Sequence, residues 1–185
     1  MKGIGIVFDT DFEEGYRSDM TPLLIATWDG KSGEIFTDMD ITEKGIRCKV
    51  WDINHEAWRK DTEIVIGHNL HGIFEEHCFD ILKEVRVASA EYLQNEGKRF
   101  SLHDLAKWNR CRSVSVELVS NIRRVMALRK GQNIKVARWA LEDARLCYDL
   151  YQRVKKKKRV RFLDAKTGKK PFVEVNWGIQ KEEEE

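Results

Sequence analysis

Residues 3–11 read GIGIVFDTD, an apolar run that ends in two acids. The β-branched and aromatic residues of this run are typical of a buried strand, which would deliver Asp9 and Asp11 at its C-terminal end. Side chains two residues apart point to the same face of an extended strand. Two carboxylates on one face repel each other unless a cation lies between them, so the pair indicates a divalent-metal site. The alternative is a solvated, acid-rich turn after the strand.

Outward from this strand, hydrophobic periodicity predicts an α/β fold with a mixed sheet of about five strands, flanked by helices. Residues 22–40 predict two strands around a turn at Asp29, and residues 46–52 predict a third strand, in an antiparallel meander. Another buried strand is expected at residues 63–66. Apolar residues three and four apart predict helices over residues 74–85, 102–106, 116–126 and 134–154. We expect a C-terminal β-hairpin over about 158–177, outside the main core.

Composition places the chain among globular proteins. It has 185 residues, 42% of them hydrophobic, with only 2 prolines, which excludes collagen-like and low-complexity classes. We expect a single domain over residues 1–178 and a disordered acidic tail over 179–185. No apolar run approaches the roughly 18 residues of a membrane span, so we expect a cytoplasmic protein without a membrane partner. With 33 Lys+Arg against 31 Asp+Glu, any case for nucleic acid rests on where the charges lie.

A third acid comes from the last predicted helix. Asp143 is spaced three or four residues from Trp139 and Leu146, so it is expected on the side that faces the core. An unpaired carboxylate is costly there, and a metal would remove that cost. Between the first strand and this helix, Glu75 and Asp80 are further acids that could complete a site.

The order of these motifs resembles the DEDD-type 3′–5′ exonucleases of the ribonuclease H-like superfamily, a group that includes polymerase proofreading domains. The three family motifs appear as FDTD at residues 8–11, GHN at 67–69 with FE at 74–75, and WALED at 139–143. Residues 79–109 are similar to the family segment with F-D-L-L and S-L-D-D-L-A. The end of the chain, LEDARLCYDLYQRV followed by FVEVNW, is similar to predicted nucleases found beside or fused to helicases.

The resemblance implies a ribonuclease H-like fold and a nuclease that cleaves DNA or RNA phosphodiesters with two Mg²⁺ or Mn²⁺ ions. It implies Asp9, Asp11 and Asp143 as metal ligands within bridging distance of one another. Either Glu75 or Asp80 would be the remaining catalytic acid. A helicase or another replication or repair protein is the implied protein partner.

Three positions depart from the family pattern. Asp11 stands where the family has Glu, Trp139 where it has Tyr, and Arg138 where one subclass has His. The indole of Trp139 cannot accept a proton. These departures favour an alternative, in which the chain is a catalytically impaired nucleic-acid-binding or interaction module with the exonuclease fold.

Both hypotheses require a surface for single-stranded DNA or RNA. Such surfaces combine cationic side chains for phosphates with aromatic rings for bases, and Trp108 is a candidate ring. The candidate nucleic-acid contacts are Asn69, Arg123, Arg124, Lys155, Lys156, Lys157, Lys158 and Arg159. The alternative for the lysine run is a solubilising helix terminus that complements the helix dipole.

Overall fold

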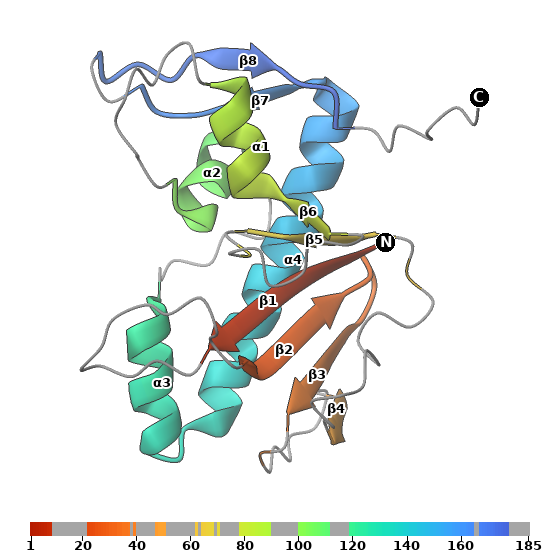
Figure 1. Cartoon of the computed structure of the whole chain (residues 1–185), viewed down its shortest axis with the longest axis vertical. Helices are drawn as coiled ribbons and strands as arrows, with labels where there is room; N and C mark the ends of the chain where they lie inside the picture. The colour runs from red at the N-terminus through yellow and green to blue at the C-terminus, as the bar shows by residue number, and fades with distance from the viewer. Residues whose placement is uncertain are drawn as a thin grey trace.

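The computed structural model confirms an α/β fold with a mixed sheet and a C-terminal hairpin (Figure 1). It describes residues 1–8, 22–37, 39, 47–50, 62, 64–68, 70, 78–89, 100–111, 119–164 and 167–177. Within these residues the sheet has six strands, one more than the five or so predicted. The acidic tail at 179–185 and its predicted disorder lie outside the described residues.

The sheet has the order β4-β3-β2-β1-β5-β6, so β1 lies in its interior. Its strands are β1 (Lys2–Phe8), β2 (Pro22–Trp28), β3 (Gly33–Thr37), β4 (Arg47–Val50), β5 (Val65–Gly67) and β6 (Cys78–Asp80). The predicted antiparallel arrangement holds for β1, β2 and β3, whereas β5 runs parallel to β1 and β6 parallel to β5. For residues 46–52 the predicted meander is wrong, because β4 runs parallel to β3. Apolar alternation identifies the buried face of a strand but not its direction.

Four helices are described, and two of them differ from the prediction. They are α1 (Ile81–Ala88), α2 (Leu102–Trp108), α3 (Asn121–Arg129) and α4 (Asn133–Lys157). The predicted helix over 74–85 is wrong for residues 78–80, which form β6, because a short apolar run fits a strand as well as a helix. The third helix begins later than predicted, at Asn121, where the Ser120 hydroxyl accepts a hydrogen bond from the amide of Arg123.

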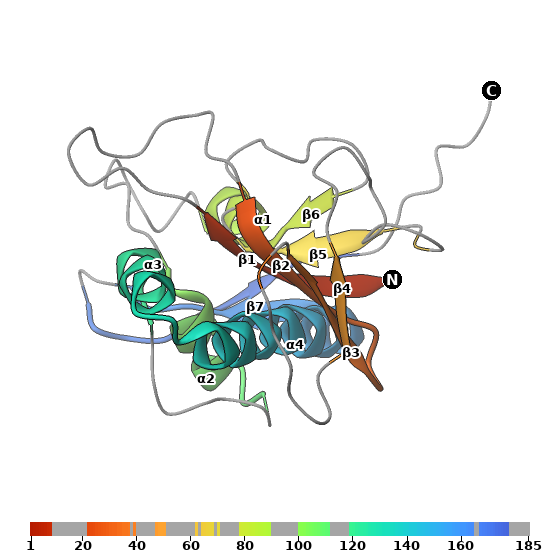
Figure 2. The ribbon, with the colours of Figure 1, turned by 90° about the horizontal axis from the view of Figure 1, so that it is seen from below.

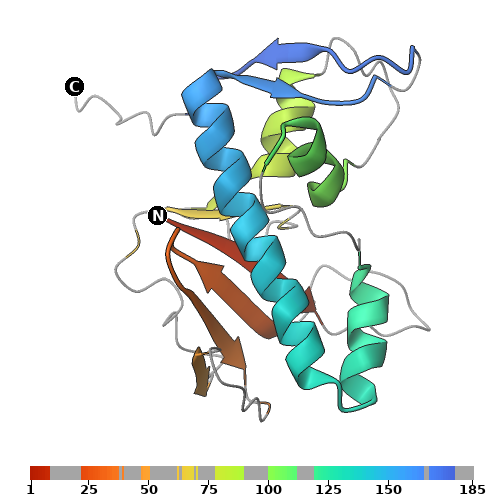
Figure 3. The ribbon, with the colours of Figure 1, turned by 180° about the vertical axis from the view of Figure 1, so that it is seen from behind.

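Helix α4 packs directly on the backbone of β1. Figure 2 shows α4 running beneath the sheet, and Figure 3 shows it crossing β1 on its way from α3 to the hairpin. A Cβ atom on Gly3 would lie 2.0 Å from the carbonyl oxygen of Ala144, and one on Gly5 would lie 2.0 Å from that of Ala140. The two glycines therefore let helix and strand approach more closely than any side chain allows.

The C-terminal hairpin belongs to the main core. It pairs β7 (Arg159–Arg161) with β8 (Phe172–Glu174). Val160 and Phe162 are fully buried in the same apolar cluster as residues of α1, α2 and α4, and Trp177 stacks on Tyr151 with ring centroids 6.1 Å apart. The expectation of a hairpin outside the core is therefore wrong, because alternate residues of the strand segment point inward.

No helix in the described part of the chain is both long and apolar enough to cross a membrane.

Replacing Gly5 with Ala should lower the free energy of unfolding by about 3 kcal/mol, the upper end of the cost of overpacking a core. The reason is that the new methyl would meet a backbone oxygen, which no change of rotamer can move. Urea denaturation measures the effect. Val87→Ala, at a side chain that is 67% exposed, is the control and should change the value by less than about 0.5 kcal/mol. Rescue of Gly5→Ala by Ala140→Gly would contradict the backbone contact.

Candidate functional site

The end of β1 is fixed by the first residue of α3. The amide of Phe8 donates to Oδ1 of Asn121 at 3.1 Å, and Nδ2 of Asn121 donates to the carbonyl oxygen of Phe8 at 2.9 Å. This pair of bonds anchors the last described residue before Asp9. Four predicted site residues lie outside the described residues, namely Asp9, Asp11, Asn69 and Glu75. The distance between Asp9 and Asp143 therefore stays a prediction.

Asp143 lies where α2, α3 and α4 meet, and it is paired. Its Oδ2 is 2.7 Å from Nη2 of Arg124, and its Oδ1 is 3.3 Å from Nε2 of His103. The Asp143 side chain is 18% exposed, and that of Arg124 only 6%. The prediction that Asp143 faces the interior agrees with this placement. The guanidinium of Arg124 compensates the cost of burying the carboxylate, which the sequence argument had assigned to a metal.

Arg124 was predicted to contact nucleic acid, but the structure places it inside the protein. Its guanidinium is held by Asp143, so a phosphate would reach it only by displacing that carboxylate. Its neighbour Arg123 is exposed, as the prediction requires.

Asp80 acts as a helix cap. Its Oδ1 accepts from the amides of Leu82 (2.8 Å) and Lys83 (3.4 Å) at the start of α1. Its Oδ2 accepts from the amide of Leu70 at 2.9 Å. These bonds to backbone amides give the acid at this position a structural role.

Two histidines, His68 and His103, lie near Asp143. Nε2 of His68 and Nδ1 of His103 are buried without a hydrogen-bond partner in the described structure. Burial lowers the pKa of His68, while the nearby charges of Asp80 and Asp143 oppose that shift. Burial likewise raises the pKa of the Cys147 thiol well above its usual range, and Asp143 adds to that rise.

The described residues do not form a metal centre around Asp143. Among them, no group of three or more His, Cys, Asp or Glu side chains is close enough to hold an ion. A metal at Asp143 would need Arg124 to withdraw and further ligands from outside the described residues. The predicted metal set of Asp9, Asp11 and Asp143 stays a prediction, because two of these three residues lie outside the described part of the chain.

A second charged region lies at the other end of α4. Lys155, Lys156 and Lys157 form its last turn, and Lys158 caps the helix in a left-handed conformation (φ 52°). All three lysines of that turn, with Lys158 and Arg159, are exposed. The structure thus places the predicted basic run at the surface.

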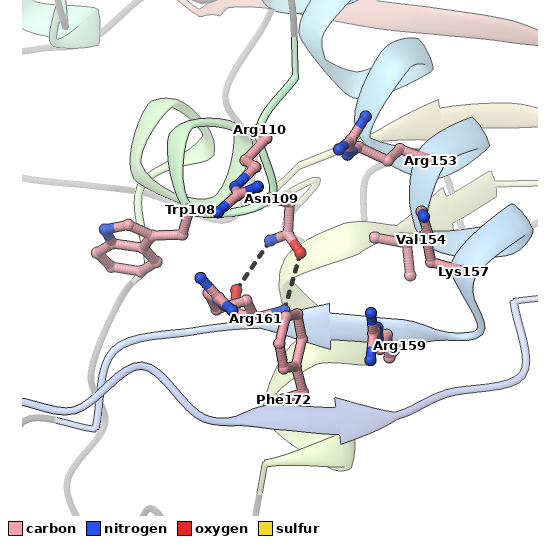
Figure 4. Close-up of a pocket in the computed structure, with 9 residues that line it drawn as sticks. All are labelled: Trp108, Asn109, Arg110, Arg153, Val154, Lys157, Arg159, Arg161 and Phe172. Atoms are coloured by element: carbon pink, nitrogen blue, oxygen red, sulfur yellow. Dashed lines mark hydrogen bonds between the residues drawn. The ribbon is translucent and has the colours of Figure 1, made fainter.

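Beside this run is a cavity of about 250 Å³, which we call the hairpin pocket (Figure 4). Its cationic side chains are Arg110, Arg153, Lys157, Arg159 and Arg161. Trp108 and Phe172 add aromatic rings to its wall. Sequence reasoning missed Arg153, Arg161 and Phe172 as site residues. The alternation of charged and apolar residues in RVRF at 159–162 was the available signal, since it puts Arg159 and Arg161 on one face.

No protein-family model matches the chain, and no curated protein matches it.

Breaking the Arg124–Asp143 pair should destabilise the fold. We expect Asp143→Asn to lower the free energy of unfolding by about 3 kcal/mol, because it leaves the buried guanidinium without a counter-charge. The double variant Arg124→Met/Asp143→Leu should recover most of that loss, since it leaves no unpaired charge. Urea denaturation of Asp143→Leu, Arg124→Met and their combination forms the test, and additive losses would contradict a direct pair.

Proposed function

We propose that the protein binds single-stranded nucleic acid, DNA or RNA, through the basic end of α4. The observation that carries the proposal is the exposure of five consecutive cations at residues 155–159. Cations that neutralise phosphates release condensed counterions, which gives affinity without reading sequence. A nucleic-acid strand would therefore contact this surface first.

The charge at this end of α4 exceeds what the helix itself requires. A helix C-terminus carries roughly −0.5 of an elementary charge, and a single cation in the last turn complements it. Five cations in succession leave a surplus of about four positive charges at this surface. Because the whole chain has a formal net charge of only +2, the surplus is a local feature. The alternative, in which the lysines only keep the helix end soluble, accounts for one or two of them. It does not account for five cations in succession.

The pairing of Asp143 supports binding without catalysis. The carboxylate is engaged by Arg124 and His103, and the departures at Trp139 and Arg138 remove the groups that the resembling family has there. A module that retains the fold and the basic surface fits these features.

The salt dependence of binding tests the proposal. Lys155, Lys156 and Lys158, changed together to Gln, should flatten the slope of log affinity against log salt by about 2, because each lost phosphate contact removes roughly 0.7. Fluorescence anisotropy with a labelled single strand at several salt concentrations gives the slope. The matched control changes Lys31, Lys83 and Lys135 to Gln and should keep the original slope. Absence of binding at low salt, or equal slopes for both variants, would refute this surface.

A second candidate function is the Mg²⁺- or Mn²⁺-dependent 3′–5′ exonuclease that the resemblance implies, with a helicase or another replication or repair protein as a possible partner. The two hydrogen bonds between Asn121 and Phe8 favour this candidate, because they fix the backbone just before Asp9 and Asp11. In this candidate Asp9, Asp11 and Asp143 would be the metal ligands, and Glu75 or Asp80 the remaining acid.

A cleavage assay separates the two candidates. With binding alone, labelled single-stranded DNA and RNA should stay intact in Mg²⁺ or Mn²⁺. The exonuclease instead predicts shortening from the 3′ end that Asp9→Asn reduces to background, because a neutral amide is a poor ligand for either ion. Equal cleavage by wild type and Asp9→Asn would indicate a contaminating nuclease.

A further inference from the structure

The hairpin pocket has cations on three sides. Arg110 follows α2, Arg153 and Lys157 lie on the last turns of α4, and Arg159 and Arg161 lie on β7 (Figure 4). None of the described residues that line the cavity is acidic. The C-terminal ends of α2 and α4 each carry roughly −0.5 of an elementary charge. The five cations therefore exceed the combined charge of the two helix ends about fivefold.

These cations lack ion-pair partners within the described part of the chain. The ion pairs among the described residues join Asp143 to Arg124 and His103, and neither involves a cation of the pocket. Glu174 is opposite Arg159 in the hairpin register but lines only the neighbouring surface. Nε of Arg161 is buried and has no hydrogen-bond partner among the residues that the structure describes. A buried donor without a partner is costly, and a bound anion would satisfy it.

Aromatic contacts fix the orientation of two guanidinium groups. The Arg159 and Arg161 guanidinium carbons lie 4.4 Å and 4.0 Å from the ring centroid of Phe172, which is 43% exposed. Such cation–π contacts hold a guanidinium without consuming its hydrogen bonds. Trp108, on the side of α2, provides a ring on which a base can stack.

The backbone of the pocket is held in place before any ligand binds. Nδ2 of Asn109 donates to the carbonyl oxygen of Arg161 at 2.8 Å, and the amide of Arg161 donates to Oδ1 of Asn109 at 2.8 Å. Arg110 is in the left-handed conformation (φ 58°), which glycine adopts more easily at a helix end. An arginine at this strained position is explained if its guanidinium binds a ligand.

We propose that the hairpin pocket binds the terminal phosphate monoester of a nucleic-acid strand, with the adjoining base on Trp108. This inference rests on the proposed function and adds the part of the strand that is recognised. A phosphate monoester carries close to two negative charges at neutral pH, and arginine pairs with it through two parallel hydrogen bonds. An internal phosphodiester carries one charge and continues in two directions, which suits a cavity with walls on three sides less well.

The test compares three strands of one sequence that end in a 5′-phosphate, a 3′-phosphate or hydroxyl groups only. Anisotropy, with the label away from the varied end, should show at least about tenfold tighter binding of one phosphorylated strand, equivalent to one charge-assisted hydrogen bond. Free nucleoside monophosphate should displace the phosphorylated strand at a lower concentration than inorganic phosphate does, because it also offers a base to Trp108.

Arg159→Gln/Arg161→Gln should abolish the preference for a phosphorylated end. Arg153→Gln, on a helix surface, is a second variant that should weaken the preference even if the hairpin change disturbs folding. The matched control, Lys31→Gln/Lys135→Gln, removes the same charge elsewhere and should keep the preference.

Equal affinity for all three strands would overturn the pocket assignment and leave the proposed function standing. If no strand binds at low salt, the proposed function fails. Binding of the mononucleotide alone would then identify a free nucleotide as the ligand and overturn the terminal-phosphate assignment.

Discussion

The close contact between β1 and α4 determines where every candidate site lies. Gly3 and Gly5 bring the backbone of an interior strand against the carbonyl oxygens of Ala144 and Ala140, with no side chain between them. This contact fixes the distance of the 25-residue helix from the sheet and its rotation about its own axis. The helix then extends beyond the sheet to the hairpin (Figure 3). Asp143 and the basic run are consequently held on one rigid element.

The length of α4 separates the two charged regions. Asp143 and Lys157 are 14 positions apart, which corresponds to about 21 Å along the helix axis. Screening by salt acts over roughly 8–10 Å, so the charge of Asp143 has little influence on the electrostatic potential at the hairpin pocket. Arg124 reduces that influence further, because it neutralises the carboxylate locally. The chain can therefore combine acids and cations in nearly equal numbers and still present a strongly cationic surface.

Long periodic segments were predictable from the sequence, whereas short segments and features that join distant segments were not. The periodicity of residues 134–154 identified α4 and the inward side of Asp143. The residues at 78–80 were assigned to a helix because three apolar-rich positions carry no distinct period. Arg124 was expected at the surface because charged residues usually lie there, and its partner is 19 positions away on another helix. The hairpin pocket escaped prediction for the same reason, since Trp108, Arg153 and Phe172 meet only in the folded chain.

Whether Asp143 can take any other ligand depends on whether Arg124 can leave it. The Arg124 guanidinium is almost fully buried. If it separated from Asp143 without reaching solvent, it would lose its counter-charge, and the loss would cost several kcal/mol of stability. A shift of α3 would relieve that cost by carrying Arg124 to solvent. The same helix, however, holds the end of β1 through Asn121, so a shift that frees Asp143 also loosens the backbone leading to Asp9. Because Arg124 and Asn121 both lie on α3, this helix stabilises a paired Asp143 and a fixed end of β1 together.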